Sequence, residues 1–596
     1  MSGAAQNPTS FFLGVQCSLS GLQWRERPHD NRIALTLSQR LDLPEIIGRV
    51  IAGRGIGLEA ATDYLHPTLR GTMPDPRGLK DMEAGAGRLA EAIMGGENIA
   101  VFGDFDVDGA TSSALLTRYL RAAGGRVDIY IPDRLTEGYG PNTPALEKLK
   151  SGGAAVVVTV DCGTTSHAPL ADARALGLDV VVIDHHEPEP LLPDVLALIN
   201  PKRLDEDGSL AHLAAVGLTF LLAVATNRTL REAGWFAGRP EPDLLSLLDL
   251  VALGTVCDVV PLLGLNRAFV NQGLKVLARR QNLGLAALCD VAGIDRTPEA
   301  YHLGYVLGPR VNAGGRVGQS WLGARLLSSD APDDAWAMAE RLDTHNKERQ
   351  EIERGVLDDA LARLANEADP HAIVTVAGEG WHPGVIGIVA NRIVDRYNLP
   401  ACVMAINGDE VVGSGRSIPG VDLGAAILAA RQAGLLTRGG GHVMAAGFSL
   451  PKAGIPAFTE FLEDRIGKHL ADSPIAPQLT LDGAVSVKGA SRELIEALQQ
   501  LSPFGPGNAE PKFAIPSVQI KRPSVVGDGH VRGFLTDDGG GSLPMIAFRA
   551  MESDIGPALL SAKKSPLHVA GRLRINHWQG RETLQMQVDD VAAPRP

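Results

Sequence analysis

Three aspartates alternate in the stretch Asp-Phe-Asp-Val-Asp-Gly at residues 104–109, directly after the apolar run at 99–102. An Ala- and Leu-rich segment follows at 110–120, so the pattern predicts a buried strand, a short loop and a helix. Alternation along the backbone sends Asp104 and Asp106 to the same side of the chain. Carboxylates this close repel one another and are costly to desolvate, which favours a multivalent cation among them. For this motif alone a plainer interpretation stays open, in which one aspartate caps the helix and the others are solvated.

Short apolar runs alternate with helix-like segments from residue 99 to about residue 200. The runs lie at residues 99–103, 127–131, 155–160 and 180–183. Continuous β-branched runs, separated by enough chain for crossover helices, predict a parallel sheet covered on both faces. In such a sheet, ligands collect at the carboxyl ends of the strands.

Side chains that can bind metals follow three of these runs. The first run ends in Asp104 and Asp106, the third in Asp161, and the fourth in Asp184, His185 and His186. Each residue alone has a plain alternative, as a turn residue or a satisfied buried imidazole, but their joint position at one rim favours a shared site. Oxygen ligands with one or two imidazoles suit Mn²⁺ or Mg²⁺ better than a structural zinc ion.

The sequence resembles the DHH phosphoesterases, which take their name from the Asp-His-His now at 184–186 and also carry the motif at 104–109. The similarity is greatest to their RecJ branch of bacterial single-strand-specific 5′-to-3′ exonucleases, and it covers about residue 50 to the end. In that family an aspartate bridges two divalent cations, and the resemblance gives this role to Asp161. The metal ligands that it implies are Asp104, Asp106, Asp161, His185 and Asp258.

The resemblance implies further roles around the metals. Asp161, His186 and His442 are the expected catalytic residues, with His186 as a phosphate contact or proton donor and His442 facing the metals. Asp108 and Asp184 are expected to support the ligands without binding metal, and Asp108 is alternatively a helix cap. Some relatives carry a histidine two residues before Asp104. Here Phe102 stands at that position, so one metal is expected to be weaker, more hydrated or bound only with substrate.

Glycine-rich stretches later in the chain are candidates for binding phosphate. Gly-Pro-Arg-Val-Asn-Ala-Gly-Gly-Arg at 308–316 predicts an oxyanion-binding loop, with a charged surface turn as the alternative. It resembles the P-R-x-N-A-x-G-R motif of the same exonucleases. A second α/β unit at about 371–470 contains two more such stretches, at 413–417 and 439–447, and the latter resembles a G-G-G-H-x-x-A-A-G motif. The phosphate-binding residues that follow from these resemblances are Arg310, Asn312, Arg316, Ser414, Arg416, Ser417, Gly440 and Gly441.

A single long helix is predicted at about 333–366, with a proline near its start and another shortly after its end. Its high charge indicates a solvated spacer between domains. Contact of Asn346 and Arg349 with a DNA backbone is the alternative.

The C-terminal part changes character at about residue 474. Short Val- and Thr-rich runs divided by Gly and Asp turns predict a small antiparallel barrel. Cations and aromatic residues are interleaved there, which is typical of an OB-fold that grips single strands, although an ordinary barrel surface remains the alternative. These residues are Lys521, Arg522, Arg532, Arg549, Arg572, Arg574 and Arg581 with Phe534, Phe548 and Trp578.

Length and composition limit the class of protein. At 596 residues the chain is too long for one core. The net charge of −13 excludes a broadly basic surface but not a local cationic groove. The five cysteines are scattered without C-x-x-C spacing, which indicates a reducing compartment. The chain carries no apolar run of membrane-spanning length, so we expect a cytoplasmic protein without a membrane partner.

Together these features predict an α/β fold. It comprises an N-terminal extension at 1–45, partly disordered, and a parallel-sheet DHH domain with a helical preface at 46–330. A connecting helix at 331–370 leads to a smaller DHHA1-type α/β domain at 371–472, and an OB-fold barrel follows at 473–596. The expected activity is 5′-to-3′ hydrolysis of single-stranded DNA to 5′-mononucleotides with two Mn²⁺ or Mg²⁺ ions, in DNA repair and recombination.

Two alternatives remain at this point. One is a phosphodiesterase of the same superfamily acting on oligonucleotides or cyclic dinucleotides, and the other is a catalytically silent DNA-binding scaffold. The expected partners are single-stranded DNA with a 5′ end, with a single-strand-binding protein and a helicase as further candidates. A monomer is expected.

Overall fold

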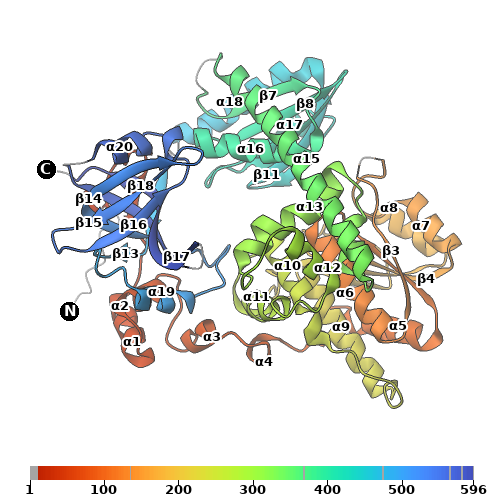
Figure 1. Ribbon diagram of the computed structural model, residues 1–596. Helices are drawn as coiled ribbons and strands as arrows, with labels where there is room; N and C mark the ends of the chain where they lie inside the picture. Colours follow the sequence, from red (N-terminus) through yellow and green to blue (C-terminus); the bar gives the residue numbers. More distant parts are fainter. Residues whose placement is uncertain are drawn as a thin grey trace, which may run out of the picture. The chain divides into compact units, whose positions relative to one another are not determined.

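The computed structural model describes residues 11–134, 136–366, 370–472, 476–562, 565–578 and 581–594, without the side chains of 577, 578 and 581. The chain forms two compact units. The larger unit comprises residues 73–261 and 269–475, and the smaller comprises residues up to 72, 262–268 and those from 476 on. Figure 1 shows the helices and strands of both units.

The larger unit begins with a parallel sheet of five strands in the order β3-β2-β4-β5-β6. The strands are β2 (Asn98–Gly103), β3 (Arg126–Tyr130), β4 (Ala154–Val160), β5 (Asp179–Ile183) and β6 (Ala197–Ile199). The first four coincide with the four predicted runs, which confirms the parallel sheet. The sequence analysis missed β6, since it has only three residues.

Helices cover both faces of this sheet. They are α5 (Met82–Gly95), α6 (Val107–Ala122), α7 (Thr143–Ser151), α8 (His167–Ala175) and α9 (Ala215–Glu232). The chain continues through further helices, α10 (Leu248–Cys257), α11 (Gly264–Leu277), α12 (Leu283–Val291), the π-helix η4 (His302–Leu307), α13 (Gly308–Val317) and α14 (Leu322–Leu327). On one face, Leu146 of α7 and Leu170 of α8 pack against Phe102 and Val182. On the other face, Gly85 of α5 lies against Val181 and Ile199, as the alternation of a strand requires.

Helix α15 (Pro332–Leu364) leads to a second, mixed sheet in the order β10-β11-β9-β8-β7. The strands are β7 (Val374–Glu379), β8 (Ala401–Asn407), β9 (Glu410–Arg416), β10 (Arg438–His442) and β11 (Ala445–Pro451), and only β7 and β8 pair in parallel. The helices are α16 (Pro383–Tyr397), α17 (Leu423–Gln432) and α18 (Ile455–Asp472). Separate cores on the two faces, one with α17 and α18 and one with α15 and α16, make this a second α/β domain.

The predicted solvated face of α15 is wrong at its centre. Asp343, Asn346, Arg349 and Glu353 are buried. Arg349 donates to Glu353 at 2.6 Å and to Asn346 at 3.0 Å, so the charge is paired within the helix. Most polar groups of this stripe are paired, although Nε of Arg349 has no described hydrogen-bond partner, and charge density alone does not reveal such pairing.

The smaller unit contains a closed barrel of five strands, β14-β15-β16-β18-β17, whose last strand pairs back with β14. Its elements are β12 (Gln478–Leu481), β13 (Gly483–Ala484), α19 (Arg492–Gln499), β14 (Phe513–Val526), β15 (His530–Thr536), β16 (Ser542–Ala547), α20 (Ile555–Ser561), β17 (Leu567–Trp578) and β18 (Arg581–Ala592). The barrel is not fully antiparallel as predicted, because β16 pairs with β18 in parallel. Strand β17 runs opposite to β16 but pairs with β14, so the following strand β18 pairs with β16 in the same direction.

Residues 11–72 belong to the smaller unit, contrary to the predicted boundaries. Strand β1 (Gln23–Glu26) pairs in parallel with β12. Helices α1 (Asn31–Leu41) and α2 (Glu45–Ala52) bury apolar side chains in the same core as α19 and the barrel. The short helices α3 (Ala61–Leu65) and α4 (Leu69–Thr72) follow. The partners of this segment lie more than 400 residues away in sequence, so local patterns could not assign it.

In the described ranges, no helix combines the length and apolarity needed to cross a membrane.

Candidate active site

The carboxyl ends of the parallel strands place three aspartates in register. The N–H groups of Asp104, Asp161 and Asp184 donate to carbonyls of the neighbouring strands at 2.9 to 3.3 Å, which extends the ladder past the strand ends. Asp161 has a positive φ of 62° and turns the chain away from the sheet there. The predicted rim of acidic residues is therefore a structural feature of the sheet.

Carboxylate and imidazole groups from four separate segments meet at this rim. The Nε2 atom of His185 lies 3.3 Å from Oδ1 of Asp161 and 3.6 Å from Oδ2 of Asp258. Three groups have ligand atoms within 4.8 Å of one another, namely Asp104-Asp106-Asp161, Asp161-His185-His186 and Asp108-His185-Asp258. Asp161 and His185 each belong to two groups, so the three form one connected cluster.

The cluster contains polar atoms that the protein itself leaves unsatisfied. Oδ1 of Asp104, Oδ1 of Asp161 and Oδ2 of Asp258 are buried, and none has a hydrogen-bond partner among the described residues. Burying a carboxylate oxygen without a partner is costly. Three such atoms around one imidazole fit the donor preferences of Mn²⁺ and Mg²⁺.

Burial and mutual repulsion shift the pKa values of these groups. Burial, with the negative charge of Asp106, raises the pKa of Asp104 and Asp161 well above the usual range of a carboxyl group. Burial and the charge of Asp108 raise the pKa of Asp258 to about 9. Burial lowers the pKa of His185 to about 4, so its imidazole is neutral near pH 7 and has a lone pair free for a metal.

Asp106 and Asp108 have different partners from those expected. Asp106, rather than Asp108, caps α6, because its Oδ1 accepts from the N–H of Gly109 at 3.0 Å. Asp108 lies inside the helix and accepts from the N–H groups of Ala215 and Val216 at 2.7 and 2.9 Å. It therefore caps α9, more than 100 residues away in sequence. Gly109 is required here, since a Cβ atom would lie 2.4 Å from the Asp104 carbonyl oxygen.

Asp184 orients His186. Its Oδ1 atom lies 2.7 Å from Nδ1 of His186, and its Oδ2 accepts from the N–H of Thr164. Burial alone would lower the pKa of His186, but the hydrogen bond and charge of Asp184 more than offset it, and the pKa is raised. The Tyr139 hydroxyl donates to the Asp161 carbonyl at 3.1 Å and lies 3.4 Å from the same nitrogen of His186.

Phe102 is fully buried and stacks on Tyr130 with ring centroids 5.4 Å apart. It belongs to the core beneath the sheet and supplies no ligand.

Arginines from four elements gather beside the acidic cluster. Burial first, and then the positive charges of Arg134, Arg349 and Arg416, lower the pKa of Arg316 to about 10. Asp106 opposes this shift, and the guanidinium of Arg134 lies 4.9 Å from the ring centroid of Phe105 in the metal-binding loop. Arg134, Arg316 and Arg416 form no ion pair with any described carboxylate. An anion is the partner that such a cluster lacks.

The stretch at 308–316 is a helix, α13, and not the predicted loop. Pro309 lies in its first turn, where the missing N–H costs nothing. The glycines allow close packing, since a Cβ on Gly315 would lie 3.0 Å from the Phe105 side chain. Arg316 donates to the Gly384 carbonyl at 3.0 Å and lies in the arginine cluster.

Other predicted phosphate contacts of the larger unit have structural partners. Arg310 donates to Asp343 at 2.9 Å and to the Val306 carbonyl at 2.7 Å, so its charge is already paired. Asn312 lies half-buried on α13. The buried Ser417 hydroxyl donates to the Val421 carbonyl at 2.7 Å, which removes Ser417 as a phosphate ligand.

In the second sheet, Ser414 and Arg416 face one another on β9. Nη1 of Arg416 lies 3.2 Å from the Ser414 hydroxyl, and Gly387 leaves room for both side chains. The predicted glycine loop at 439–447 is instead the β10–β11 hairpin. Gly440 has open space around it, whereas a Cβ on Gly441 would lie 2.4 Å from the Ala445 carbonyl oxygen. His442 ends β10 with an exposed side chain.

The barrel supports only part of the predicted cationic track. Arg574 is paired with Glu510, and Arg572 with Asp589 at 2.7 Å. Trp578 and Arg581, for which no side chains are described, lie outside this comparison. Exposed cations and rings do alternate on β14 to β16, where Lys521 pairs across the sheet with Phe534.

Arg134 and Tyr139 were missed in the sequence. Both follow β3, whose end, unlike those of β2, β4 and β5, carries no aspartate directly after it. The signal was available, because a cation and an aromatic residue at a strand end occupy the same rim as the acidic residues.

Comparisons with known proteins agree with this geometry. Residues 98–255 match the DHH family, N-terminal domain, residues 369–468 match the DHHA1 domain, and residues 481–590 match the RecJ OB domain. The chain is 36% identical to the single-stranded-DNA-specific exonuclease RecJ of Salmonella typhimurium, over 92% of this chain and 96% of that protein. It is 35% identical to the Escherichia coli protein of the same name, over 96% and 99%. The crystal structure of RecJ in complex with Mn²⁺ from Thermus thermophilus is similar with a TM-score of 0.78, at 29% identity over 96% of this chain and 80% of that one.

Proposed function

The chain belongs to the RecJ family, and on this premise we propose that it is a divalent-metal-dependent exonuclease that degrades single-stranded DNA from the 5′ end to 5′-mononucleotides. The observation that carries the proposal is that a cluster of carboxylates and a cluster of arginines lie at the same rim of the sheet. Among the described residues, buried carboxylate oxygens without a hydrogen-bond partner lie beside arginines without an ion pair. Divalent cations would satisfy the first group and a phosphodiester the second.

Two metal positions follow from the shared residues of the cluster. Asp104, Asp106 and Asp161 would hold one cation, and Asp161, His185 and Asp258 the other, so that Asp161 bridges them. When bound, two such cations supply Lewis-acid activation of a water and of the scissile phosphate. Asp108 is occupied by the first turn of α9 and would support the site without binding metal.

His186 is suited to donate a proton or a hydrogen bond. Asp184 holds its Nδ1 side and raises its pKa, which favours the imidazolium form with its proton on Nε2. A positive group at this place would stabilise the charge that develops on the phosphate or on the leaving oxygen.

The arginine cluster would bind the phosphates of the strand. Arg316 and Arg134 come from the DHH domain, while Arg416 comes from the DHHA1 domain together with Ser414. We assign the 5′-terminal phosphate to Ser414 and Arg416, with Gly440 allowing close approach, and we keep His442 as a catalytic candidate on the same hairpin.

The two alternative functions fit less well. A silent scaffold gives no reason for buried carboxylates without partners, which lower its stability. A cyclic dinucleotide needs no barrel, whereas the exposed cations and rings on β14 to β16 are suited to a longer strand.

The remaining points concern the location, the oligomeric state and the partners of the protein in the cell. We propose a cytoplasmic monomer acting in repair and recombination, with a single-strand-binding protein and a helicase as partners. The five free cysteines support a reducing compartment. Size-exclusion chromatography with light scattering tests the monomer.

A labelled single strand tests the activity. Single-stranded DNA labelled at the 5′ end is incubated with Mn²⁺, with and without EDTA, beside the Asp161→Ala variant and the same strand labelled at the 3′ end. We expect early release of labelled mononucleotide from the 5′ end only, and none with EDTA or the variant. A strand that stays intact but is retarded in a gel would support the scaffold. Cleavage of dinucleotides alone would support the small-substrate phosphodiesterase.

A further inference from the structure

Two tyrosines on the larger unit present their rings to solvent. Tyr301 and Tyr305 are 48% and 75% exposed, and their rings stack with centroids 5.3 Å apart and planes within 22°. Exposed aromatic rings in near-parallel array are uncommon on a soluble surface, since they bury each other only in part. They offer flat faces that another planar group can extend.

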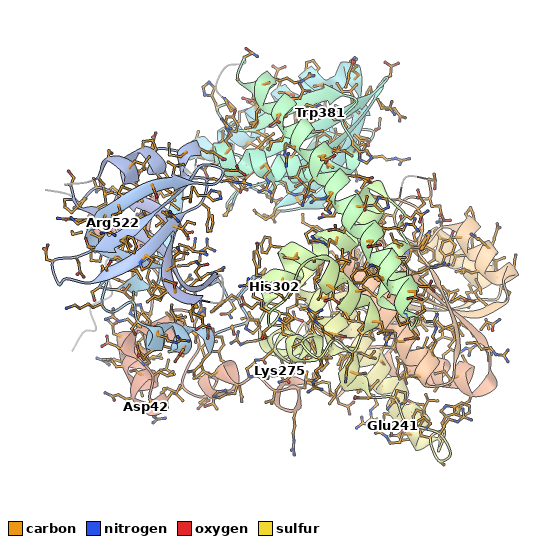
Figure 2. The ribbon with its side chains drawn as sticks, viewed as in Figure 1. Asp42, Glu241, Lys275, His302, Trp381 and Arg522 are labelled. Atoms are coloured by element: carbon orange, nitrogen blue, oxygen red, sulfur yellow. The ribbon has the colours of Figure 1, made fainter. Side chains whose placement is uncertain are left out.

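The two tyrosines lie at a π-helix. Tyr301 directly precedes the π-helix η4, and Tyr305 lies within it. In an α-helix, residues four apart are offset by about 40° around the axis, whereas the wider π turn brings them closer to alignment. Such turns are rare and are found mostly at functional sites. His302, labelled in Figure 2, is buried next to Tyr301; its Nδ1 accepts from the Glu299 N–H, and its Nε2 lies 3.3 Å from Nε of Arg296.

The π-helix packs against the helix end that carries Asp258. The Cys257 thiol donates to the Leu303 carbonyl at 3.4 Å, and a Cβ on Gly308 would lie 2.4 Å from that sulfur. Gly304 lies against Val256 in the same turn of α10. One side of η4 is therefore fixed to the candidate active site, while the tyrosine side is open.

We propose that Tyr301 and Tyr305 form a stacking platform for bases of the single-stranded DNA substrate, next to the Asp258 side of the active site. The proposal rests on the proposed nuclease function. Every base has a flat π-face, so stacking suits an exonuclease that must accept any sequence. The exposed Arg296 has its Nε 3.3 Å from the His302 ring, which lies beside Tyr301, and its guanidinium supplies a cation for a neighbouring phosphate.

Affinity measurements with matched variants test the platform. Binding of a fluorescent oligothymidylate is followed by anisotropy in EDTA, where no cleavage takes place. Stacking on one ring contributes about 1–3 kcal/mol per base, so Tyr305→Ala is expected to weaken binding about fivefold or more. Tyr305→Phe keeps the ring and should bind like the unmodified chain. Trp336→Ala removes an exposed ring (46%) from α15 and serves as the control, with no expected change.

A second measurement asks whether the lost contact is with a base. Single abasic sites are placed along the oligonucleotide, and each is combined with Tyr305→Ala in a double-mutant cycle. We expect one or two adjacent positions at which the two losses are not additive, and in cleavage assays a rise in KM with little change in kcat. Tyr305→Gln replaces the alanine variant if circular dichroism shows that the latter is unfolded.

The outcomes separate this inference from the nuclease function. Additive losses at every position, unchanged affinity, or a phenylalanine variant as weak as alanine would each overturn the platform while leaving the nuclease intact. An unmodified chain that neither binds nor cuts single strands would instead overturn the proposed function.

Discussion

The larger unit leaves charges at its rim without described partners, while two arginines on the barrel of the smaller unit are held in ion pairs. At the rim, buried oxygens of Asp104, Asp161 and Asp258 have no described hydrogen-bond partner. On the barrel, Arg572 and Arg574 are held by Asp589 and Glu510. Both regions looked like binding sites in the sequence. The difference teaches that a charged group without a partner in the folded protein indicates a ligand-binding site, whereas a charged group with a partner in the protein has a structural role.

The Asp161→Ala variant tests the rim most directly. Because Asp161 belongs to two of the three metal-binding groups, its loss should lower kcat/KM on single-stranded DNA by at least about a thousandfold. The metal-free variant should be as stable as the unmodified chain or more so, since one repelling carboxylate is gone. Thermal unfolding in EDTA measures this. A variant that is inactive and also strongly destabilised would mean that Asp161 is structural, and the comparison would fail.

Arg316→Ala tests the cationic half of the rim. A guanidinium that contacts a phosphate in the transition state is worth on the order of a hundredfold in kcat/KM. We expect a loss of that size, with little change in thermal stability because only the bond to the Gly384 carbonyl is lost. Activity within threefold of the unmodified chain would contradict a phosphate role. Arg416→Ala should remove the preference for a 5′-phosphorylated end.

The metal-free protein should become less stable as the pH rises from 7 to 9. The pKa of Asp258 is about 9 in the folded chain, whereas an unfolded aspartate titrates near 3.9. The folded state therefore binds more protons in this range, and each carboxyl group with a pKa raised in this way lowers the free energy of unfolding by at most about 1.4 kcal/mol per pH unit. His185, with its pKa lowered to about 4, contributes no slope above pH 7.

Chemical denaturation at pH 7, 8 and 9 in EDTA measures this slope. Saturating Mn²⁺ should abolish it, because bound cations replace the protons, and Asp258→Asn should reduce it. A metal-free slope of zero or of opposite sign would show that the rim carboxylates are already satisfied.

Arg574→Ala on the barrel should have the smallest effect. Breaking a partly exposed ion pair with Glu510 costs about 1 kcal/mol or less of unfolding free energy. Activity should stay within threefold. The matched comparison is Arg316→Ala, since both variants remove the same side chain. If Arg574→Ala lowered activity as much as Arg316→Ala, paired charge would be as functional as unpaired charge.

The sheet and its rim were predictable from sequence because both depend on local patterns. β-Branched runs specify buried parallel strands, and the carboxyl ends of such strands necessarily share one edge, which brings Asp104, Asp161 and His185 together. The resemblance supplied Asp258, which has no local signal.

The structure differs from the predictions where packing between residues far apart in the sequence determines the conformation or the partner of a side chain. Glycine and proline at 308–316 suggested a loop, but the glycines allow α13 to approach Phe105 and Cys257, and the proline lies in its first turn. Arg310, Ser417 and Arg574 have the right chemistry for phosphate, and only the partners Asp343, Val421 and Glu510 show that they are already engaged. The N-terminal segment pairs with β12, a partner that no window of sequence contains.

Because Asp108 accepts hydrogen bonds from the first turn of α9, the amide groups of that turn report on the nearby metal-binding loop. Both of its carboxylate oxygens hold amides of the first turn, those of Ala215 and Val216. Exchange of these two amide hydrogens with solvent requires that their bonds to Asp108, in the first turn of α6 next to the metal-binding loop, open. Their deuterium uptake is thus a gauge of how often the nuclease centre opens, readable without substrate and without touching a single metal ligand.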